Sequence, residues 1–212
     1  MPRQLRCCMH AKNAHSTYAR HAVQDDAVPA SVEGVLGGEQ HVAPWDAVES
    51  RQFVEMLQRE VCMGAARALD VGAGIGRVTQ DVLRHYFQGV DVMEPSPKML
   101  HAARVALCGH GGVDEPTPGA ATTACADMAA SSTAVSTTSY RFIQSGIHDF
   151  SFEPDVLYDC IWLQWVIGCA SDVQLIDFLR AAGSALAPHG CQCGPRCQIQ
   201  RSAHGPDAGA GG

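Results

Sequence analysis

The feature of this sequence that most constrains its fold is a run of closely spaced glycines, Gly72-Ala-Gly-Ile-Gly76. It follows the short apolar segment 68–71, which predicts a buried strand, and it precedes 77–87, whose apolar residues recur at helical spacing. A strand, a glycine loop and a helix in this order let a ligand approach the backbone closely, because glycine has no Cβ atom, and place that ligand against the amides of a helix N-terminus. The alternative is a glycine-rich turn that binds nothing.

The spacing of the glycines indicates which kind of nucleoside ligand the loop suits. The dinucleotide fingerprint is G-x-G-x-x-G, whereas here the third glycine comes one residue early and Arg77 occupies the last position. With the preceding Leu69-Asp70, this form is typical of S-adenosylmethionine-binding enzymes. Glu94 lies 22 residues after Gly72, where nucleoside-binding α/β folds place the carboxylate that holds the ribose. The alternative for Glu94 is a solvated charge at a strand end.

The rest of the chain repeats the alternation of strand and helix. Apolar strands are predicted at 90–94, 140–144 and 158–164, and amphipathic helices at 47–61, 97–107 and 171–186. Short loops between alternating strands and helices are typical of a parallel sheet covered by helices. The predicted fold class is therefore α/β, a Rossmann-like parallel sheet of the class I methyltransferase type, preceded by an N-terminal helical segment.

Composition divides the chain into a core and three irregular segments. Residues 1–27 are polar and predict a flexible arm, and 28–190 predict the α/β domain. Within that domain, 109–138 consist mainly of Gly, Ala, Thr and Ser and predict a low-complexity insertion in a surface connection. Residues 191–212 lack apolar periodicity and predict a disordered or non-native tail, so we expect the sheet to lack its C-terminal strands. The strand around Ile161 would then be an exposed apolar edge.

Length and charge exclude several classes of function. The 212 residues suffice for one domain, and a net charge of -7 disfavours nucleic acid or an anionic membrane as a partner, because phosphate binding depends on Lys and Arg. No apolar run reaches the roughly 18 residues of a membrane span, and no secretory signal begins the chain. We therefore expect a soluble monomer in the cytoplasm or the nucleus. The cysteine spacing from Cys191 to Cys197 is not a standard zinc arrangement, so we expect no metal site.

Two further stretches follow predicted strands and are therefore expected at the ligand-binding edge of the sheet. Residues 145–150 follow the third strand, on the adenine side of such folds, although Asp149 could instead begin a simple turn. The strand 158–164 leads into Gln164-Trp165, which presents polar and aromatic groups at that edge. We expect Trp162 in the core and Trp165 in the site.

On these residues the chain resembles the α-N-terminal protein methyltransferases, which methylate the free N-terminal amine of proteins that begin X-Pro-Lys or X-Pro-Arg. The stretches that carry the resemblance are Val32-Glu-Gly-Val-Leu-Gly-Gly38, Leu69 to Arg77, Asp149-Phe150 with Glu153-Pro154, and Ile161 to Gly168. The resemblance implies S-adenosylmethionine as cofactor, protein N-termini as partners, and direct displacement, in which the neutral amine attacks the sulfonium methyl group. An α-amino pKa near 7.7–8.0 leaves roughly a tenth to a fifth of the amine neutral at pH 7, so a modest base and good alignment suffice.

The resemblance also implies roles for particular residues. The cofactor would be held by Gly72, Gly74 and Arg77 at its methionine end, by Glu94, Pro95 and Ser96 at its ribose, by Ile147 and His148 at its adenine, and by Gln164, which closes the site. The N-terminus of the substrate would be lined by Leu36, Gly37, Val42 and Trp165. Glu94 stands in place of the family's usual Asp.

The chain departs from the family pattern in ways that keep alternatives open. Cys169 stands where the family has a histidine thought to position or deprotonate the amine, so no catalytic residue is assigned. The Lys-Asp/Glu-Asn motif and the acidic substrate loop expected after 188–190 are absent, which predicts a truncated or frameshifted member. One alternative is a non-catalytic protein that binds the cofactor or a partner. Another is a methyltransferase for a different substrate, against which 35–38 and 163–165 argue.

Overall fold

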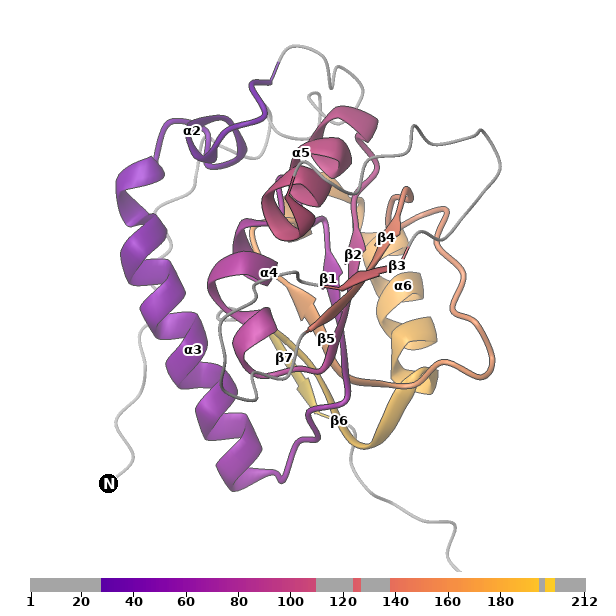
Figure 1. The fold of residues 1–212 in the computed structure, drawn as a ribbon. Helices are drawn as coiled ribbons and strands as arrows, with labels where there is room; N and C mark the ends of the chain where they lie inside the picture. The colour runs from indigo at the N-terminus through magenta and orange to yellow at the C-terminus, as the bar shows by residue number, and fades with distance from the viewer. Residues whose placement is uncertain (1–27, 110–123, 127–137, 195–196, 201–212) are drawn as a thin grey trace, which may run out of the picture.

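The computed structural model describes residues 28–109, 124–126, 138–194 and 197–200, with the backbone alone for 124–126 and beyond residue 191. Within these residues, the centre of the molecule is a seven-stranded sheet in the order β3-β4-β2-β1-β5-β6-β7 (Figure 1). The inner strands are parallel to one another, and the edge strands β3 and β7 run antiparallel to their neighbours. The predicted α/β class with a parallel sheet is confirmed.

The elements follow the predicted alternation, with shifts of a few residues at their ends. The strands are β1 (Arg67–Val71), β2 (Gly89–Met93), β3 (Ala124–Ala126), β4 (Ser139–Ile143), β5 (Tyr158–Leu163), β6 (Leu186–Gly194) and β7 (Cys197–Gln200). The α-helices are α2 (Val32–Val35), α3 (Ala43–Glu60), α4 (Arg77–Asp81), α5 (Pro97–Cys108) and α6 (Asp172–Ser184), and short 3₁₀ helices are η1 (Gln40–Val42), η2 (Leu83–His85) and η4 (Ile167–Cys169).

Helices cover both faces of the sheet, as Figure 1 shows, with α3, α4 and α5 on one side and α6 on the other. Successive strand residues point to opposite faces, so Ala68 of β1 joins the core under α3 and α5, whereas Leu69 joins the core under α6. Phe178 of α6 packs into the second core. Burial on both faces explains why the strands read as continuous apolar runs.

The sheet continues past Gly190, where the sequence predicted that it would stop. β6 pairs in parallel with β5, and β7 pairs antiparallel with β6. Ile161 is fully buried and Cys191 is 3% exposed, so the expected exposed edge at β5 and the irregular tail from Cys191 are both wrong for the residues described. The physical reason is that ladder hydrogen bonds come from the backbone, and strand formation depends on neighbours more than on local apolar pattern.

Capping residues explain where α5 and α6 begin. Ser171 caps α6 in a capping box with Gln174, and Ser96 caps α5 with Pro97 at its first position. The helix predicted over 77–87 is shorter than expected, because α4 ends at Asp81 and η2 follows.

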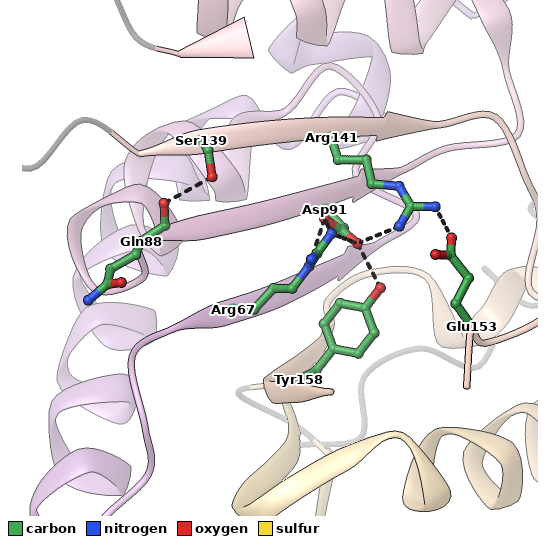
Figure 2. Close-up of polar contacts among 7 residues, drawn as sticks. All are labelled: Arg67, Gln88, Asp91, Ser139, Arg141, Glu153 and Tyr158. Carbon is green, nitrogen blue, oxygen red and sulfur yellow. Dashed lines mark hydrogen bonds and ion pairs between the residues drawn. The ribbon is translucent and has the colours of Figure 1, made fainter. Parts of the chain in front are cut away.

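A polar network crosses four strands on the α6 side of the sheet (Figure 2). The buried carboxylate of Asp91 on β2 accepts hydrogen bonds from Arg67 on β1, at 2.8 Å, and from the Tyr158 hydroxyl on β5, at 2.7 Å. Arg141 on β4 lies between Asp91 and the exposed Glu153, with which it forms an ion pair. The network therefore ties the loop before β5 to the sheet.

Some predicted segments lie outside the described residues, namely the arm 1–27, most of the insertion 109–138 and the chain end from 201. Within the insertion, the structure places β3 beside β4. In the part of the chain that is described, no helix is both long enough and apolar enough to cross a bilayer.

Candidate functional site

A cavity of about 200 Å³ opens at the carboxyl ends of β1, β2 and β5. This is the edge at which open α/β sheets bind ligands. The cavity brings together eight of the predicted site residues, Leu36, Gly72, Gly74, Arg77, Glu94, Pro95, Gln164 and Trp165, and Cys169 joins them. Residues far apart in the sequence therefore share one site, as the position of their strands predicted.

The glycine loop after β1 needs its glycines for conformation and for space. Gly72 and Gly74 have φ angles of 66° and 57°, in the left-handed region that favours glycine. A Cβ atom on Gly72 would lie 2.4 Å from Cγ2 of Val166, and one on Gly74 would lie 3.2 Å from Cγ1 of Val35. The loop is thus packed against Val166 and Val35, and a side chain on Gly72 would clash with Val166.

The carboxylate of Glu94 fastens this loop to the end of β2. Its Oε2 accepts a hydrogen bond from the backbone amide of Gly74 at 2.8 Å, and its Oε1 accepts one from the amide of Ser96 at 3.0 Å. Each carboxylate oxygen has a second lone pair, so the group can still accept from a ligand hydroxyl. Ser96 itself is buried and does not line the cavity, because its hydroxyl caps α5 at Met99.

Two buried nitrogen donors of the cavity wall have no hydrogen-bond acceptor among the described residues, namely Nη1 of Arg77 and Nε2 of Gln164. The rest of each side chain is fixed. Nη2 of Arg77 lies 2.8 Å from Oδ2 of Asp46, and Oε1 of Gln164 accepts from Nε1 of Trp162 at 2.7 Å. Buried donors without acceptors are rare and costly, so a ligand that supplied an acceptor to either nitrogen would gain a favourable hydrogen bond.

Trp165 follows Gln164 at the mouth of the cavity in an unusual conformation. Its φ angle is 62°, which is strained for a bulky side chain, and about half of the residue is exposed. The indole Nε1 donates to Oδ1 of Asp46 at 3.3 Å. Trp162, by contrast, is fully buried and lies edge-on to Phe53, so its predicted place in the core is confirmed.

Cys169, at the end of η4, completes the cavity wall beside Glu94. Desolvation by the surrounding protein raises the pKa of its thiol, and the negative charge of Glu94 raises that pKa further. The ordinary pKa of a thiol already lies above neutral pH. Cys169 therefore stays protonated at neutral pH and does not act as a general base there.

The remaining predicted residues lie near the cavity but do not line it. Ile147 packs against the core under α6, and Nε2 of His148 lies 2.9 Å from Oδ2 of Asp149. A Cβ atom on Gly146 would contact both His148 and Pro95, so this loop stands beside the cavity wall. Two residues predicted for the substrate, Gly37 and Val42, lie in the segment that follows Leu36.

Sequence reasoning missed Asp46, which contacts both Arg77 and Trp165. No motif marks this residue, and its only signal is that it is acidic and lies in the first turn of α3. The apolar residues of the wall, Val28, Val35, Ala73, Val78, Met99 and Val166, were also not predicted, although most lie within three positions of a residue that was.

Comparisons with known proteins bear on this site. Residues 13–194 match the family of AdoMet dependent proline di-methyltransferases. The chain is 35% identical over 165 residues to N-terminal Xaa-Pro-Lys N-methyltransferase 1 of Bos taurus and 33% identical to that of Homo sapiens. Each alignment covers 77% of this chain and 62% of the relative. A solved SAM-dependent methyltransferase from Leishmania major has a TM-score of 0.62 and 28% identity, covering 85% of this chain and 60% of that chain.

The chain thus spans somewhat less than two thirds of the length of these curated relatives. The match nevertheless includes the glycine loop, Glu94, Gln164 and β6, which together build the cavity and its sheet. Members of the family depend on S-adenosylmethionine, the cofactor that the glycine spacing predicted. Because the family pattern extends over most of its sequence, this protein belongs to the AdoMet dependent proline di-methyltransferase family.

Proposed function

We propose that this chain binds S-adenosylmethionine in the cavity at the carboxyl ends of β1, β2 and β5 and methylates the free α-amino group of protein N-termini that begin X-Pro-Lys or X-Pro-Arg. The observation that carries the proposal is the pair of buried donors without acceptors, Nη1 of Arg77 and Nε2 of Gln164, in the wall of that cavity. The named activity of the relatives from Bos taurus and Homo sapiens supports the choice of acceptor.

The residues of the cavity fit the chemical groups of the cofactor. Arg77 can donate from Nη1 to a carboxylate, the strongest acceptor that the methionine end offers. Gly72 and Gly74 line the cavity and have no side chain of their own to stand between the backbone and a ligand. Glu94 lines the cavity as a carboxylate, an acceptor suited to the hydroxyls of the ribose. Each contact follows from donors and acceptors that the cavity wall already presents.

The cofactor, when bound, supplies a methyl group on a positively charged sulfur. The protein's contribution is to align an acceptor nitrogen with that carbon, and the new nitrogen–carbon bond forms as the carbon–sulfur bond breaks. Leu36 and Trp165 border the cavity and would hold the acceptor's N-terminus. An α-amine has a pKa near 7.7–8.0, so a useful fraction is neutral without a strong base, and alignment carries much of the barrier.

A second candidate function is cofactor binding without catalysis. The observation that favours it is Cys169, whose protonated thiol cannot remove the amine proton. In that case the protein would bind S-adenosylhomocysteine, the reaction product, as tightly as an active relative does and yet transfer no methyl group.

Calorimetry with S-adenosylhomocysteine and the full chain tests the cofactor site. We expect saturable binding that Arg77→Met abolishes or weakens by roughly tenfold, the value of one charged hydrogen bond. Arg180→Met is the matched control, because Arg180 lies exposed on α6. A folded chain that binds no S-adenosylhomocysteine contradicts the proposal.

Mass spectrometry then separates the two candidate functions. A short peptide that begins Ser-Pro-Lys should gain methyl groups from S-adenosylmethionine, whereas its N-acetylated copy should gain none, because acetylation removes the nucleophilic amine. Binding of the cofactor without any methylation of the free peptide would favour the non-catalytic function. Methylation of both peptides would indicate a lysine side chain or another acceptor.

A further inference from the structure

Asp46, in the first turn of α3, contacts both halves of the site. Its Oδ2 lies 2.8 Å from Nη2 of Arg77, which belongs to the cofactor side, and its Oδ1 accepts from Nε1 of Trp165, which belongs to the acceptor side. Through Asp46, α3 therefore contacts the residue that begins α4 and the residue that follows Gln164 after β5.

The contact with Arg77 is buried and involves only one of the two terminal nitrogens of the guanidinium. The side chains of Arg77 and Asp46 are only 7% and 12% exposed, so the ion pair is poorly screened by solvent. The planar guanidinium presents its donors in a fixed fork. With Nη2 held by Asp46, Nη1 is the buried nitrogen of this cavity-lining side chain that has no acceptor among the described residues.

The contact with Trp165 fixes a side chain whose backbone is strained. A residue with a φ angle of 62° keeps that conformation only where its surroundings impose it, and the indole hydrogen bond to Asp46 is one such constraint. Trp165 is half exposed at the mouth of the cavity, so this hydrogen bond holds a side chain that an incoming acceptor can reach.

We propose that Asp46 is a positioning residue that couples cofactor binding at Arg77 to acceptor binding at Trp165. A ligand carboxylate on Nη1 neutralises part of the Arg77 charge and so weakens its pull on Asp46. The Asp46 carboxylate then accepts more strongly from the indole and orders Trp165 at the mouth of the cavity. The inference rests on the proposed function, since it takes the cofactor and a peptide N-terminus as the two ligands.

Coupling of this kind is reciprocal, which makes it measurable without turnover. If S-adenosylhomocysteine raises the affinity for the peptide by some factor, then the peptide raises the affinity for S-adenosylhomocysteine by the same factor. Calorimetric titration of S-adenosylhomocysteine, with and without a saturating Ser-Pro-Lys peptide, gives that factor as a ratio of two dissociation constants. For the natural chain we expect roughly fivefold or more.

Two variants each remove one of the two contacts that Asp46 makes, the first with Arg77 and the second with Trp165. Asp46→Asn keeps an acceptor oxygen for the indole but has no charge for Arg77, and Trp165→Phe keeps the ion pair but removes the indole donor. In both variants we expect the ratio of the two S-adenosylhomocysteine dissociation constants, measured without and with the peptide, to be close to one. Glu49→Gln is the matched control, because Glu49 is an exposed carboxylate on the same helix and should keep the natural factor.

The outcomes separate this inference from the proposed function. A natural chain without coupling, or variants that keep the natural factor, would overturn the role of Asp46 while leaving the cofactor site intact. If Asp46→Asn does not fold, Trp165→Phe decides alone, because its side chain is half exposed and its loss spares the core. Absence of any S-adenosylhomocysteine binding to the natural chain overturns the proposed function, and the coupling with it.

Discussion

The backbone amide of Gly74 donates to the carboxylate of Glu94 over 2.8 Å, which ties the glycine loop after β1 to the end of β2. Glu94 is only 8% exposed, and its other oxygen accepts from the amide of Ser96. One carboxylate thus shapes the loop that a nucleoside ligand would meet. The Glu94 side chain bridges two neighbouring strands, because Glu94 follows β2 and Gly74 follows β1.

Replacement of this carboxylate should weaken cofactor binding more than it weakens the fold. Glu94→Gln turns one acceptor oxygen into an amide donor, which then faces a backbone amide donor. A hydrogen bond to a charged group contributes about 1.5–3 kcal/mol, so we expect S-adenosylhomocysteine to bind roughly tenfold or more weakly by calorimetry. Glu60→Gln, an exposed carboxylate of α3, is the control. Equal affinity in Glu94→Gln and the natural chain would show that Glu94 does not shape the binding loop.

Restoring a base at position 169 should raise the rate of methyl transfer. The raised pKa of the Cys169 thiol keeps it protonated, whereas an imidazole with an ordinary pKa near 6.5 is mostly neutral at pH 7.5 and can accept a proton. General base catalysis contributes up to a factor of about 10²–10⁴, and we expect Cys169→His to raise kcat by roughly tenfold.

Cys169→Asn is the matched control, because its side chain has similar size but does not titrate. The gain in Cys169→His should fade as the pH falls below the pKa of the imidazole. An equal gain in both variants would attribute the effect to shape and not to proton transfer. No gain in either would mean that alignment alone limits the reaction.

The fold and the centre of the site were predictable because their signals are local. The glycine loop has a fixed spacing, and Glu94 and Gln164 lie at predicted strand ends, which a parallel sheet brings to one edge. Asp46 could not be found in this way. Its contacts with Arg77 and Trp165 depend on how α3 packs against the sheet, and no local pattern encodes that packing.

The strand β6 escaped prediction for a different reason. Its sequence from Cys191 has no alternation of polar and apolar residues, so periodicity gave no signal. The structure pairs it with β5, whose residue Cys160 lies opposite Cys191. Here pairing with a buried neighbour decides the conformation, and that neighbour is 31 positions away.

The polar network of Figure 2 should contribute to stability through its buried centre and little through its exposed end. Asp91 is 2% exposed, and its removal leaves the Arg67 and Arg141 charges without their shared partner. Breaking a buried ion pair costs about 3–5 kcal/mol, but Arg67 is about a third exposed and Arg141 keeps Glu153, so Asp91→Asn should lower the free energy of unfolding by less, about 2–3 kcal/mol.

Urea denaturation followed by circular dichroism measures this loss. Glu153→Gln is the comparison at the other end of the network, where solvent screens the ion pair with Arg141 and its loss should change the free energy of unfolding little. Tyr158→Phe should lie between the two, since it removes one hydrogen bond to Asp91. Similar losses in Asp91→Asn and Glu153→Gln would contradict the expected contrast between centre and edge.

Asp70, at the carboxyl end of β1, should make stability depend on pH. It is buried, and desolvation raises its pKa to about 6, although a hydrogen bond from Thr79 and the charge of Arg77 oppose the shift. The folded state therefore holds this proton more tightly than the unfolded state, in which the pKa is near 3.9. Its contribution to stability is full below about pH 4 and is lost as the pH rises through about 6.

Asp70→Asn keeps an oxygen for the Thr79 hydroxyl but cannot ionise. The variant should match the natural chain at pH 4 and exceed its unfolding free energy by up to about 3 kcal/mol at pH 7, because each unit of pKa corresponds to about 1.36 kcal/mol. Urea midpoints at the two pH values give this difference directly. Asp155→Asn, at an exposed position, is the control and should change the free energy of unfolding by the same small amount at pH 4 and at pH 7. If Asp70→Asn instead loses stability as the pH rises from 4 to 7, relative to the natural chain, the Asp70 carboxylate is stabilised by Thr79 and Arg77 more than burial opposes it.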